Sequence, residues 1–506
     1  PQSPVEMTVG PKTAMSDLYL QLNPGGDIAA IGGIARHLFA LEDQRGGVLD
    51  TTFLAEHTAD FAAFETWARA LDWAAVESFS GLTRQDLEAV AELCARSRRT
   101  IALYGMGLTQ HVHGSQSIGM LVNLLLMRGM IGREGAGICP VRGHSNVQGQ
   151  RTVGISEKPE LVPLDGLAAQ FGFEPPRDEG WTTVEVAKAL LDGRMKGFVS
   201  LGGNFARAIP DQGRLDPLWQ GLALNVQIAT KLNRSHVLVG QGAWLLPCLA
   251  RSETDLQTTG PQTVTVEDSL SHIHGSIGRR PPASPLLLSE PAIVTGLAKA
   301  TLGTGNPKLR WDDWCGDYAL IRDEIEKTYP DQFARFNARM FQAGGFYRGN
   351  SARRREWKTD SGKANFTVPD RMSALDAMPG AGVFTLMTLR SNGQFNTTIY
   401  DDTDRLRGLN GDRMIVLMSP DDVMQEGLAE GDLVTLVSAH DDGFERRLGG
   451  LRIVPYDLPR GCVGAYYPEA NPLIPLGLYD QASKTPASKG VPVRVIAAQG
   501  QGARKG

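Results

Sequence analysis

The sequence holds few cysteines, and none of them stands at a spacing typical of metal or redox sites. A C-x-x-C pair, which would indicate zinc, an iron–sulfur cluster or a redox dithiol, does not occur in it. Isolated cysteines are usually small buried residues, and sparse cysteine is typical of a reducing compartment. We therefore predict a cytoplasmic protein, and we assign no metal ligand among the five cysteines, Cys94, Cys139, Cys248, Cys315 and Cys462.

The sequence also lacks a long apolar run and a surplus of basic residues. Hydrophobic residues make up 42% of the 506 positions, but no window reaches the roughly 18 uninterrupted apolar residues of a membrane helix. The formal net charge is −5, whereas nucleic-acid-binding surfaces are usually basic. We therefore expect no membrane span and no nucleic-acid partner. The length predicts about three or four domains.

Residues 1–145 combine a helical layer with an α/β pattern. Apolar residues recur at helical spacing over residues 27–70, and Thr83 with Asp86 predicts a capping box at a helix start. A buried strand at residues 100–104 is followed by a glycine-containing loop, Gly105-Met106-Gly107-Leu108-Thr109-Gln110, and then by an apolar helix. Strand, glycine loop and helix in this order form the phosphate-binding arrangement of α/β domains.

The same pattern recurs in residues 146–278, which we predict to be a second α/β domain. A strand at residues 197–201 leads into Gly202-Gly203-Asn204, and a strand at residues 222–228 leads into Thr230-Lys231-Leu232-Asn233. Open parallel sheets bind ligands beyond the carboxyl ends of their strands. These two loops are therefore candidate ligand-binding segments.

The rest of the chain divides into a connecting part and a barrel. Residues 279–382 are irregular and rich in proline, glycine and charge, which predicts a connecting subdomain. From residue 383 to residue 506, short apolar or alternating runs separated by turn residues predict a β-barrel. The expected strands lie at 384–389, 414–418, 433–437, 451–454 and 491–496.

The segment from Gly132 to Gly149 concentrates glycines, amides, an arginine and a histidine. Glycine permits close backbone approach to a ligand, and amides can hydrogen-bond a polar heterocycle. The guanidinium of Arg142 could hold a small oxyanion through two parallel hydrogen bonds. We therefore take Arg142 and His144 as the candidate catalytic residues. No third ligand accompanies the histidine pairs at 111/113 and 272/274, so we predict no metal site there.

The segments Tyr-Gly-Met-Gly-Leu-Thr-Gln and Gly-Ile-Cys-Pro-Val-Arg-Gly-His-Ser-Asn-Val-Gln-Gly resemble the molybdopterin oxidoreductase family, in its formate-dehydrogenase-like branch. The resemblance implies Rossmann-like parallel-sheet domains and a C-terminal six-stranded barrel of the double-psi, aspartate-decarboxylase-like type. It also implies that Arg142 lies beside the metal and orients formate. The family often carries glutamine where this chain has His144, and this departure favours the formate-dehydrogenase-like relatives over the best-known enzymes.

Further loops resemble those by which the family holds its cofactor, bis(molybdopterin guanine dinucleotide) with molybdenum or tungsten. They include Ser200–Asn204, the lysine-containing loop after the next strand, and three loops of the barrel. By this resemblance the cofactor-binding residues are Gly105, Met106, Gly107, Gln110, Gly143, Gly202, Gly203, Asn204, Thr230, Lys231, Asn233, Arg390, Ser391, Gln394, Asn396, Thr397, Asn471 and Lys489.

The implied reaction is the two-electron oxidation of formate to carbon dioxide, with an electron-transfer subunit as a candidate partner. In the family, the cysteine or selenocysteine that ligates the metal and a nearby 4Fe-4S iron–sulfur cluster belong to an N-terminal portion. The sequence opens at Pro1 without methionine or a signal peptide, so we expect that portion to lie upstream and residues 1–506 alone to be catalytically silent. Two alternatives stay open: an oxidoreductase for another small oxyanion, and a non-catalytic cofactor-binding or regulatory relative.

Overall fold

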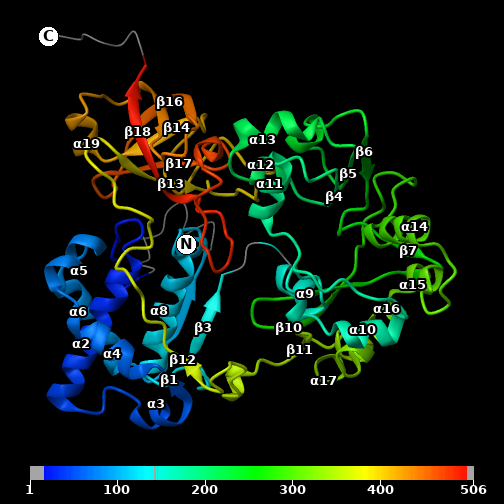
Figure 1. The fold of residues 1–506 in the computed structure, drawn as a ribbon, viewed down its shortest axis with the longest axis horizontal. Helices are drawn as coiled ribbons and strands as arrows, with labels where there is room; N and C mark the ends of the chain where they lie inside the picture. Colours follow the sequence, from blue (N-terminus) through cyan, green and yellow to red (C-terminus); the bar gives the residue numbers. More distant parts are fainter. Residues whose placement is uncertain (1–15, 142–143, 145, 499–506) are drawn as a thin grey trace, which may run out of the picture.

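The computed structural model describes residues 16–141, 144 and 146–498. Figure 1 shows a helical layer in blue, an α/β region in cyan and green, and a β-barrel in orange and red above the helical layer. The predicted mixed α/β fold with parallel sheets and a closed six-stranded barrel is confirmed. Within the described ranges, no helix has both the length and the apolar character needed to cross a membrane.

The helical layer packs around helix α2, whose buried face contributes Ile28, Leu38 and Phe39 to one apolar core. The predicted capping box is confirmed, because the Thr83 hydroxyl accepts from the Asp86 N–H while the Asp86 carboxylate accepts from the Thr83 N–H. The helices of this layer are α2 (Asp27–Arg45), α3 (Thr51–His57), α4 (Phe61–Ala70), α5 (Trp73–Ser80) and α6 (Arg84–Arg96).

A two-stranded parallel sheet follows, and it departs from the prediction in two ways. The predicted loop after the first strand is a short helix, α7, that starts at Met106. The glycine-rich segment contains a strand, β3, which the sequence did not reveal because glycine and proline are weak strand formers. The elements are β2 (Ile101–Tyr104), α7 (Met106–Thr109), α8 (Gly114–Met127) and β3 (Gly137–Pro140).

The second α/β unit is a three-stranded parallel sheet in the order β4-β5-β6. Helices α11 to α13 cover one face, where Phe198 packs with the fully buried Trp219. The elements are α9 (Val147–Thr152), η1 (Pro159–Leu161), α10 (Leu164–Phe171), α11 (Thr183–Leu191), β4 (Gly197–Leu201), α12 (Phe205–Ala208), α13 (Gln212–Trp219), β5 (Leu224–Ala229), η2 (Arg234–Val237) and β6 (Ala243–Pro247).

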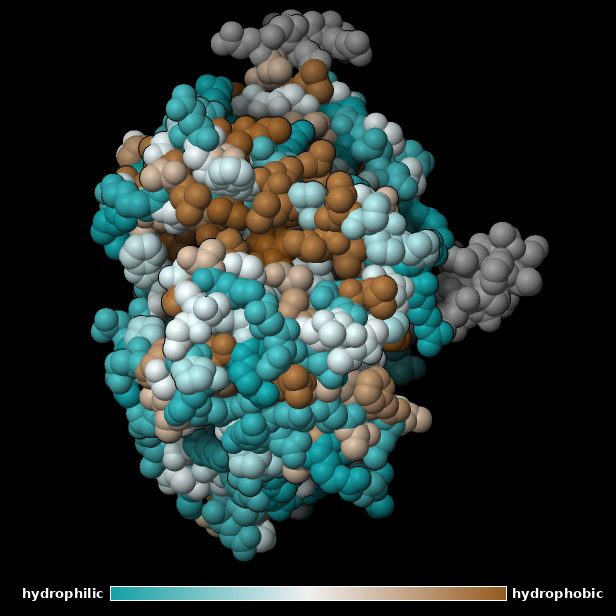
Figure 2. All heavy atoms as spheres, turned by 90° about the vertical axis from the view of Figure 1, so that its right-hand side faces the viewer, coloured by the Kyte–Doolittle hydropathy of each residue, from teal (hydrophilic) through white to brown (hydrophobic). Residues whose placement is uncertain are grey.

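The other face of this sheet is apolar and only partly covered. Val199, Leu201 and Trp244 point to this face and are 57%, 52% and 63% exposed. Figure 2 shows a continuous hydrophobic area on this side of the molecule. Parallel sheets are usually covered on both faces. Here helix α14 (Glu290–Leu302) covers only part of this face, through the buried side chain of Ile293.

The connecting region, residues 279–382, is more regular than its composition suggested, since it contains five α-helices and two short strands. Its high proline, glycine and charge content reflects the loops between these short elements. Before this region, still within residues 146–278, lie β7 (Leu256–Gln257), β8 (Gly260–Pro261), β9 (Val264–Glu267) and β10 (His272–Ser276). The elements of the connecting region are α14 (Glu290–Leu302), α15 (Trp311–Gly316), α16 (Tyr318–Thr328), α17 (Pro330–Phe333), α18 (Phe336–Arg339), β11 (Phe346–Tyr347), η3 (Ala352–Arg354) and β12 (Ala364–Asn365), which pairs with β1 (Thr58–Ala59).

The barrel closes in the strand order β13-β17-β14-β16-β15-β18. Five of its strands overlap the predicted runs, whereas β17 was missed. Every residue of β17 is buried, so it lacks the alternation that marks a half-exposed strand. The elements are β13 (Phe384–Leu389), β14 (Ile415–Met418), α19 (Pro420–Gln425), β15 (Leu433–Ser438), β16 (Arg447–Pro455), β17 (Cys462–Tyr466), η4 (Asn471–Leu473) and β18 (Lys489–Ala497).

Candidate functional site

A cavity of about 390 Å³ lies where helix α7, the second α/β unit and the barrel meet. We call it the lysine cavity, after Lys489 at the start of β18. Its volume is within the range of small-molecule sites. Six residues assigned by resemblance line it, namely Met106, Gly107, Gln110, Arg390, Asn471 and Lys489; Thr183, Thr388, Tyr467 and Ser488 also line it and were not predicted.

Two cations give the lysine cavity its charge. Lys489 Nζ donates a hydrogen bond to the main-chain oxygen of Thr388 at 2.5 Å. Burial, and secondarily the nearby Arg390, lowers the pKa of Lys489 to about 8. No aspartate or glutamate is among the described residues that line the cavity. Two positive groups without a counter-charge favour the binding of an anion there.

A second cavity, of about 210 Å³, lies between the loops after β4 and β5 and a turn of the barrel. We call it the amide cavity, because Asn204, Asn233 and Asn396 line it. The turn after β4 requires glycine, since Gly202 and Gly203 have φ values of +72° and +82°. The other predicted residues on its wall are His144, Thr230 and Lys231.

The loops on the two sides of the amide cavity are joined by hydrogen bonds. Asn204 Nδ2 donates to Thr397 Oγ1 at 2.9 Å, and Asn204 Oδ1 accepts from Ser235 Oγ at 2.6 Å. Asn233 Nδ2 donates to the main-chain oxygen of Gly203 at 2.8 Å. Thr397 thus joins the barrel to the second α/β unit, and it is not among the described residues that line the lysine cavity or the amide cavity.

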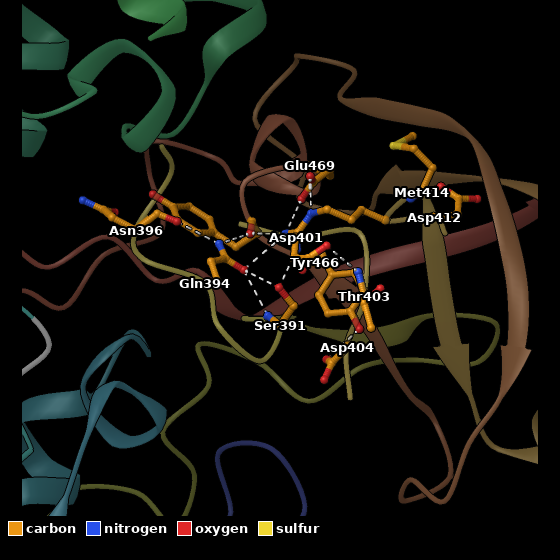
Figure 3. Close-up of polar contacts among 12 residues, drawn as sticks. Ser391, Gln394, Asn396, Asp401, Thr403, Asp404, Asp412, Met414, Tyr466 and Glu469 are labelled. Atoms are coloured by element: carbon orange, nitrogen blue, oxygen red, sulfur yellow. Dashed lines mark hydrogen bonds and ion pairs between the residues drawn. The ribbon is translucent and has the colours of Figure 1, made fainter. Parts of the chain in front are cut away.

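The barrel turn at residues 391–397 is organised by the side chain of Gln394, as Figure 3 shows. Gln394 Oε1 accepts from the Ser391 N–H at 3.0 Å, and Gln394 Nε2 donates to the main-chain oxygen of Asn396 at 2.8 Å. Ser391 and Gln394, which were predicted to contact the cofactor, therefore shape the turn that carries Asn396. Gly105, the remaining predicted residue of the first loop, precedes α7 as its N-terminal cap.

The predicted catalytic residues are only partly described. Arg142, and with it the predicted cofactor-binding Gly143, lies outside the described residues. His144 lies on the wall of the amide cavity, where its Nε2 is 3.0 Å from Asn396 Nδ2. Burial, and then the charge of Arg390, lowers the pKa of His144 below its usual range. The imidazole is therefore neutral at pH 7 and can accept a hydrogen bond or a proton.

A third cavity, of about 280 Å³, was not predicted from the sequence. We call it the helix cavity, because it is lined by the turn before α2 and by His111. His111 is 1% exposed, and its Nδ1 has no hydrogen-bond partner among the residues that the structure describes. Burial raises the pKa of Asp27, which also lines this cavity, to about 6. The helix cavity adjoins the lysine cavity, since Gly107 and Leu389 line both. The sequence Asn-Pro-Gly-Gly-Asp at a helix start was the signal that could have indicated it.

Across the described ranges, no three His, Cys, Asp or Glu side chains converge as a metal-binding group would. His272 packs against the ring of Tyr347, and His274 Nε2 lies 3.2 Å from Asp268. His272 therefore contacts Tyr347, and His274 contacts Asp268, rather than each other.

Comparison with known proteins relates both the barrel and the whole chain to oxidoreductases. The family described as "Molydopterin dinucleotide binding domain" matches residues 384–492. Protein YdeP of Escherichia coli K12 is 40% identical over 503 residues, which are 98% of this chain and 66% of YdeP. "Uncharacterized oxidoreductase Rv2900c" of Mycobacterium tuberculosis is 41% identical over 497 residues, which are 97% of this chain and 63% of that protein. The chain therefore spans just under two thirds of the length of these relatives.

Two more distant similarities concern a part of the chain and its fold. "Putative formate dehydrogenase YrhE" of Bacillus subtilis is 29% identical over 201 residues, which are 38% of this chain and 20% of YrhE. The solved structure of acetylene hydratase from Pelobacter acetylenicus superposes with a TM-score of 0.62 at 14% identity, over 96% of this chain and 72% of that one, so the fold is shared. The barrel is thus a molybdopterin dinucleotide-binding domain, in a chain homologous over almost its whole length to YdeP and the mycobacterial oxidoreductase.

Proposed function

We propose that the chain holds two molybdopterin guanine dinucleotides with one molybdenum or tungsten ion, and that the complete protein oxidises formate to carbon dioxide. The observation that carries the proposal is the pair of cations, Arg390 and Lys489, which lie inside the matched dinucleotide-binding domain and line a cavity with no carboxylate among its described lining residues. A diphosphate would supply the missing negative charge, through hydrogen bonds from charged donors worth about 1.5 to 3 kcal/mol each.

The shape of the cavities fits such a group. A Cβ built on Gly107, Gly202 or Gly203 would meet no atom within 4 Å, so the backbone at these positions is open to a ligand. The lysine cavity offers cations for phosphates, and the amide cavity offers amides for the edge of a heterocycle. Two cavities of different chemistry, joined to one barrel, are what two dinucleotides would require.

For the reaction, formate loses two electrons and one proton to become carbon dioxide, and the bound metal cofactor supplies the redox chemistry. Arg142 would hold the carboxylate through its two parallel N–H donors. His144, neutral at pH 7, could accept the proton or hydrogen-bond a pterin. The similarity to the putative formate dehydrogenase supports formate as the substrate. By the same resemblance, a 4Fe-4S cluster and an electron-transfer subunit would carry the electrons onward.

The test is to produce the complete protein in a host that makes the cofactor, and to measure guanine nucleotide released by acid together with molybdenum and tungsten. We expect two guanine nucleotides per metal ion, and a large loss of both in Lys489→Met. The exposed Lys358 gives the matched control, so Lys358→Met should keep both. Formate-dependent dye reduction then tests the substrate. Protein free of nucleotide and metal would contradict cofactor binding, whereas loaded protein inactive with formate would favour another oxyanion or a non-catalytic role.

A further inference from the structure

Arg413 is a buried cation that the proposed chemistry does not use. It precedes strand β14 and is 5% exposed. Its guanidinium forms a two-pronged ion pair with Glu469, at 2.7 Å from Nε and 3.0 Å from Nη2. The rings of Tyr400 and Tyr466 lie 4.4 and 4.7 Å from its guanidinium carbon. Such a group is rigidly held, because packing and paired hydrogen bonds fix its plane.

The remaining N–H groups of Arg413 reach the barrel turn at residues 391–397. Nη1 donates to Ser391 Oγ at 2.6 Å, and Nη2 donates to Gln394 Oε1 at 3.2 Å. Nη2 also donates to the main-chain oxygen of Tyr467 at 2.9 Å, and that oxygen accepts from Gln394 Nε2 at 2.6 Å. Arg413 therefore holds both ends of the Gln394 side chain, directly at Oε1 and through Tyr467 at Nε2.

The barrel turn contacts His144 through Asn396 and Phe395. Gln394 Nε2 donates to the main-chain oxygen of Asn396, whose φ of +53° is a left-handed conformation that needs support from its surroundings. Asn396 Nδ2 in turn lies 3.0 Å from His144 Nε2, and the Phe395 ring centre lies 5.5 Å from the imidazole centre. With the amide donating, His144 accepts at Nε2 and carries its proton at Nδ1.

We propose that Arg413 is a positioning residue, which acts through Gln394 and Asn396 to fix the orientation and the tautomer of His144. This proposal depends on the proposed function in one respect only, which is that His144 belongs to the substrate site. The hydrogen-bond chain itself consists of protein groups alone. Among the described residues, the charged groups around the imidazole are Arg390 at the barrel, and Lys231 and Glu290 on the wall of the amide cavity.

Arg413→Lys tests this, because lysine keeps the charge beside Glu469 but cannot reach Ser391, Gln394 and Tyr467 at once. The measurement is the titration of His144 in the cofactor-free protein, by NMR of ¹³C-labelled histidine. The signal is assigned by its loss in His144→Gln among the nine histidines. We expect the midpoint to rise by about 0.5 pH unit or more towards the ordinary value, because the neutral imidazole loses a hydrogen-bond donor and gains water.

Gln394→Met is the second variant, since it removes the relay and leaves the charge of Arg413 in place. It should shift His144 in the same direction, and it carries the test if Arg413→Lys does not fold. The control is Arg447→Lys on β16, an exposed arginine paired with Glu445, which should leave the titration unchanged. An unchanged His144 midpoint in folded Gln394→Met, or in folded Arg413→Lys, overturns the proposal. A shift in protein that binds no cofactor would retain the positioning role and refute the proposed function alone.

Discussion

Lys489→Met should abolish dinucleotide binding, and it should also remove a gain in stability that the cofactor-free wild-type protein shows as the pH rises above 8. In the folded chain, burial and Arg390 lower the pKa of Lys489 from 10.5 to about 8. The unfolded chain therefore binds more protons than the folded chain between pH 8 and pH 10.5. Stability rises with pH wherever the unfolded state binds more protons. The wild-type protein should thus gain stability relative to Lys489→Met across this interval.

The expected size of this gain follows from the lowered pKa. The lowering of the Lys489 pKa from 10.5 to about 8 means that the folded state with charged Lys489 is destabilised by about 3 kcal/mol at pH 7. Methionine removes that cost but also the hydrogen bond from Lys489 Nζ to Thr388, worth about 1.5 to 3 kcal/mol for a charged donor. At pH 7 the two effects nearly cancel, so the variant should be as stable as the wild type or slightly more stable. Near pH 10.5 the wild type should be the more stable by about 2 to 3 kcal/mol.

The assay is urea unfolding of both proteins, followed by circular dichroism at pH 7, 8.5 and 10. Comparing midpoints at each pH cancels the titration of all other groups. Lys358→Met, at an exposed lysine, should follow the wild type at every pH. If Lys489→Met were strongly destabilised at pH 7 and the difference from wild type did not change with pH, Lys489 would not be a buried, uncompensated cation. The charge argument for the lysine cavity would then be wrong.

Three further outcomes are expected. Arg446→Met should lower the free energy of unfolding in urea by about 3 to 5 kcal/mol. The side chain of Asp211 is 1% exposed and pairs with Arg446 at 2.6 Å, so Asp211 would lose the partner that joins the second α/β unit to the barrel. A loss below about 1 kcal/mol would contradict this. Arg142→Lys should lower formate oxidation by about 100-fold at unchanged cofactor content, since lysine lacks the paired donors, and unaltered turnover would reject the assignment. Trp244→Ser should weaken the binding of a hydrophobic dye with a stability change within about 0.5 kcal/mol, because the side chain is 63% exposed; unchanged dye binding would show that the exposed sheet face is not the dye's site.

Sequence patterns predicted the parts of the fold that depend on local order. The capping box at Thr83 lies within one turn of chain, and the strand at residues 197–201 is bounded by turn residues on both sides. Both were correctly placed. Strand β17 was missed, because it is buried on all sides in a closed barrel and so has no polar face to give it a period. Strand β3 was missed because its glycine and proline content is typical of a loop.

The residue types of the candidate site were likewise visible in the sequence, as glycines, amides and basic residues after strands. The grouping of these residues in space was not visible in the sequence. Asn204 and Thr397 are joined by a hydrogen bond across 193 positions of sequence, and Arg413 and Glu469 across 56. The helix cavity needs the turn before α2 to meet strand β17, so neither segment shows it alone.

Thus the sequence by itself determined which loops could bind a dinucleotide, since that depends on backbone freedom and on donors carried by neighbouring residues. Only the tertiary structure decided that these loops form separate cavities, that the described lining of the lysine cavity places no carboxylate beside Lys489 and Arg390, and that Arg413 supports the turn facing His144. The physical reason is that burial, and the electrostatic cost it brings, is a property of the surroundings that distant segments create together.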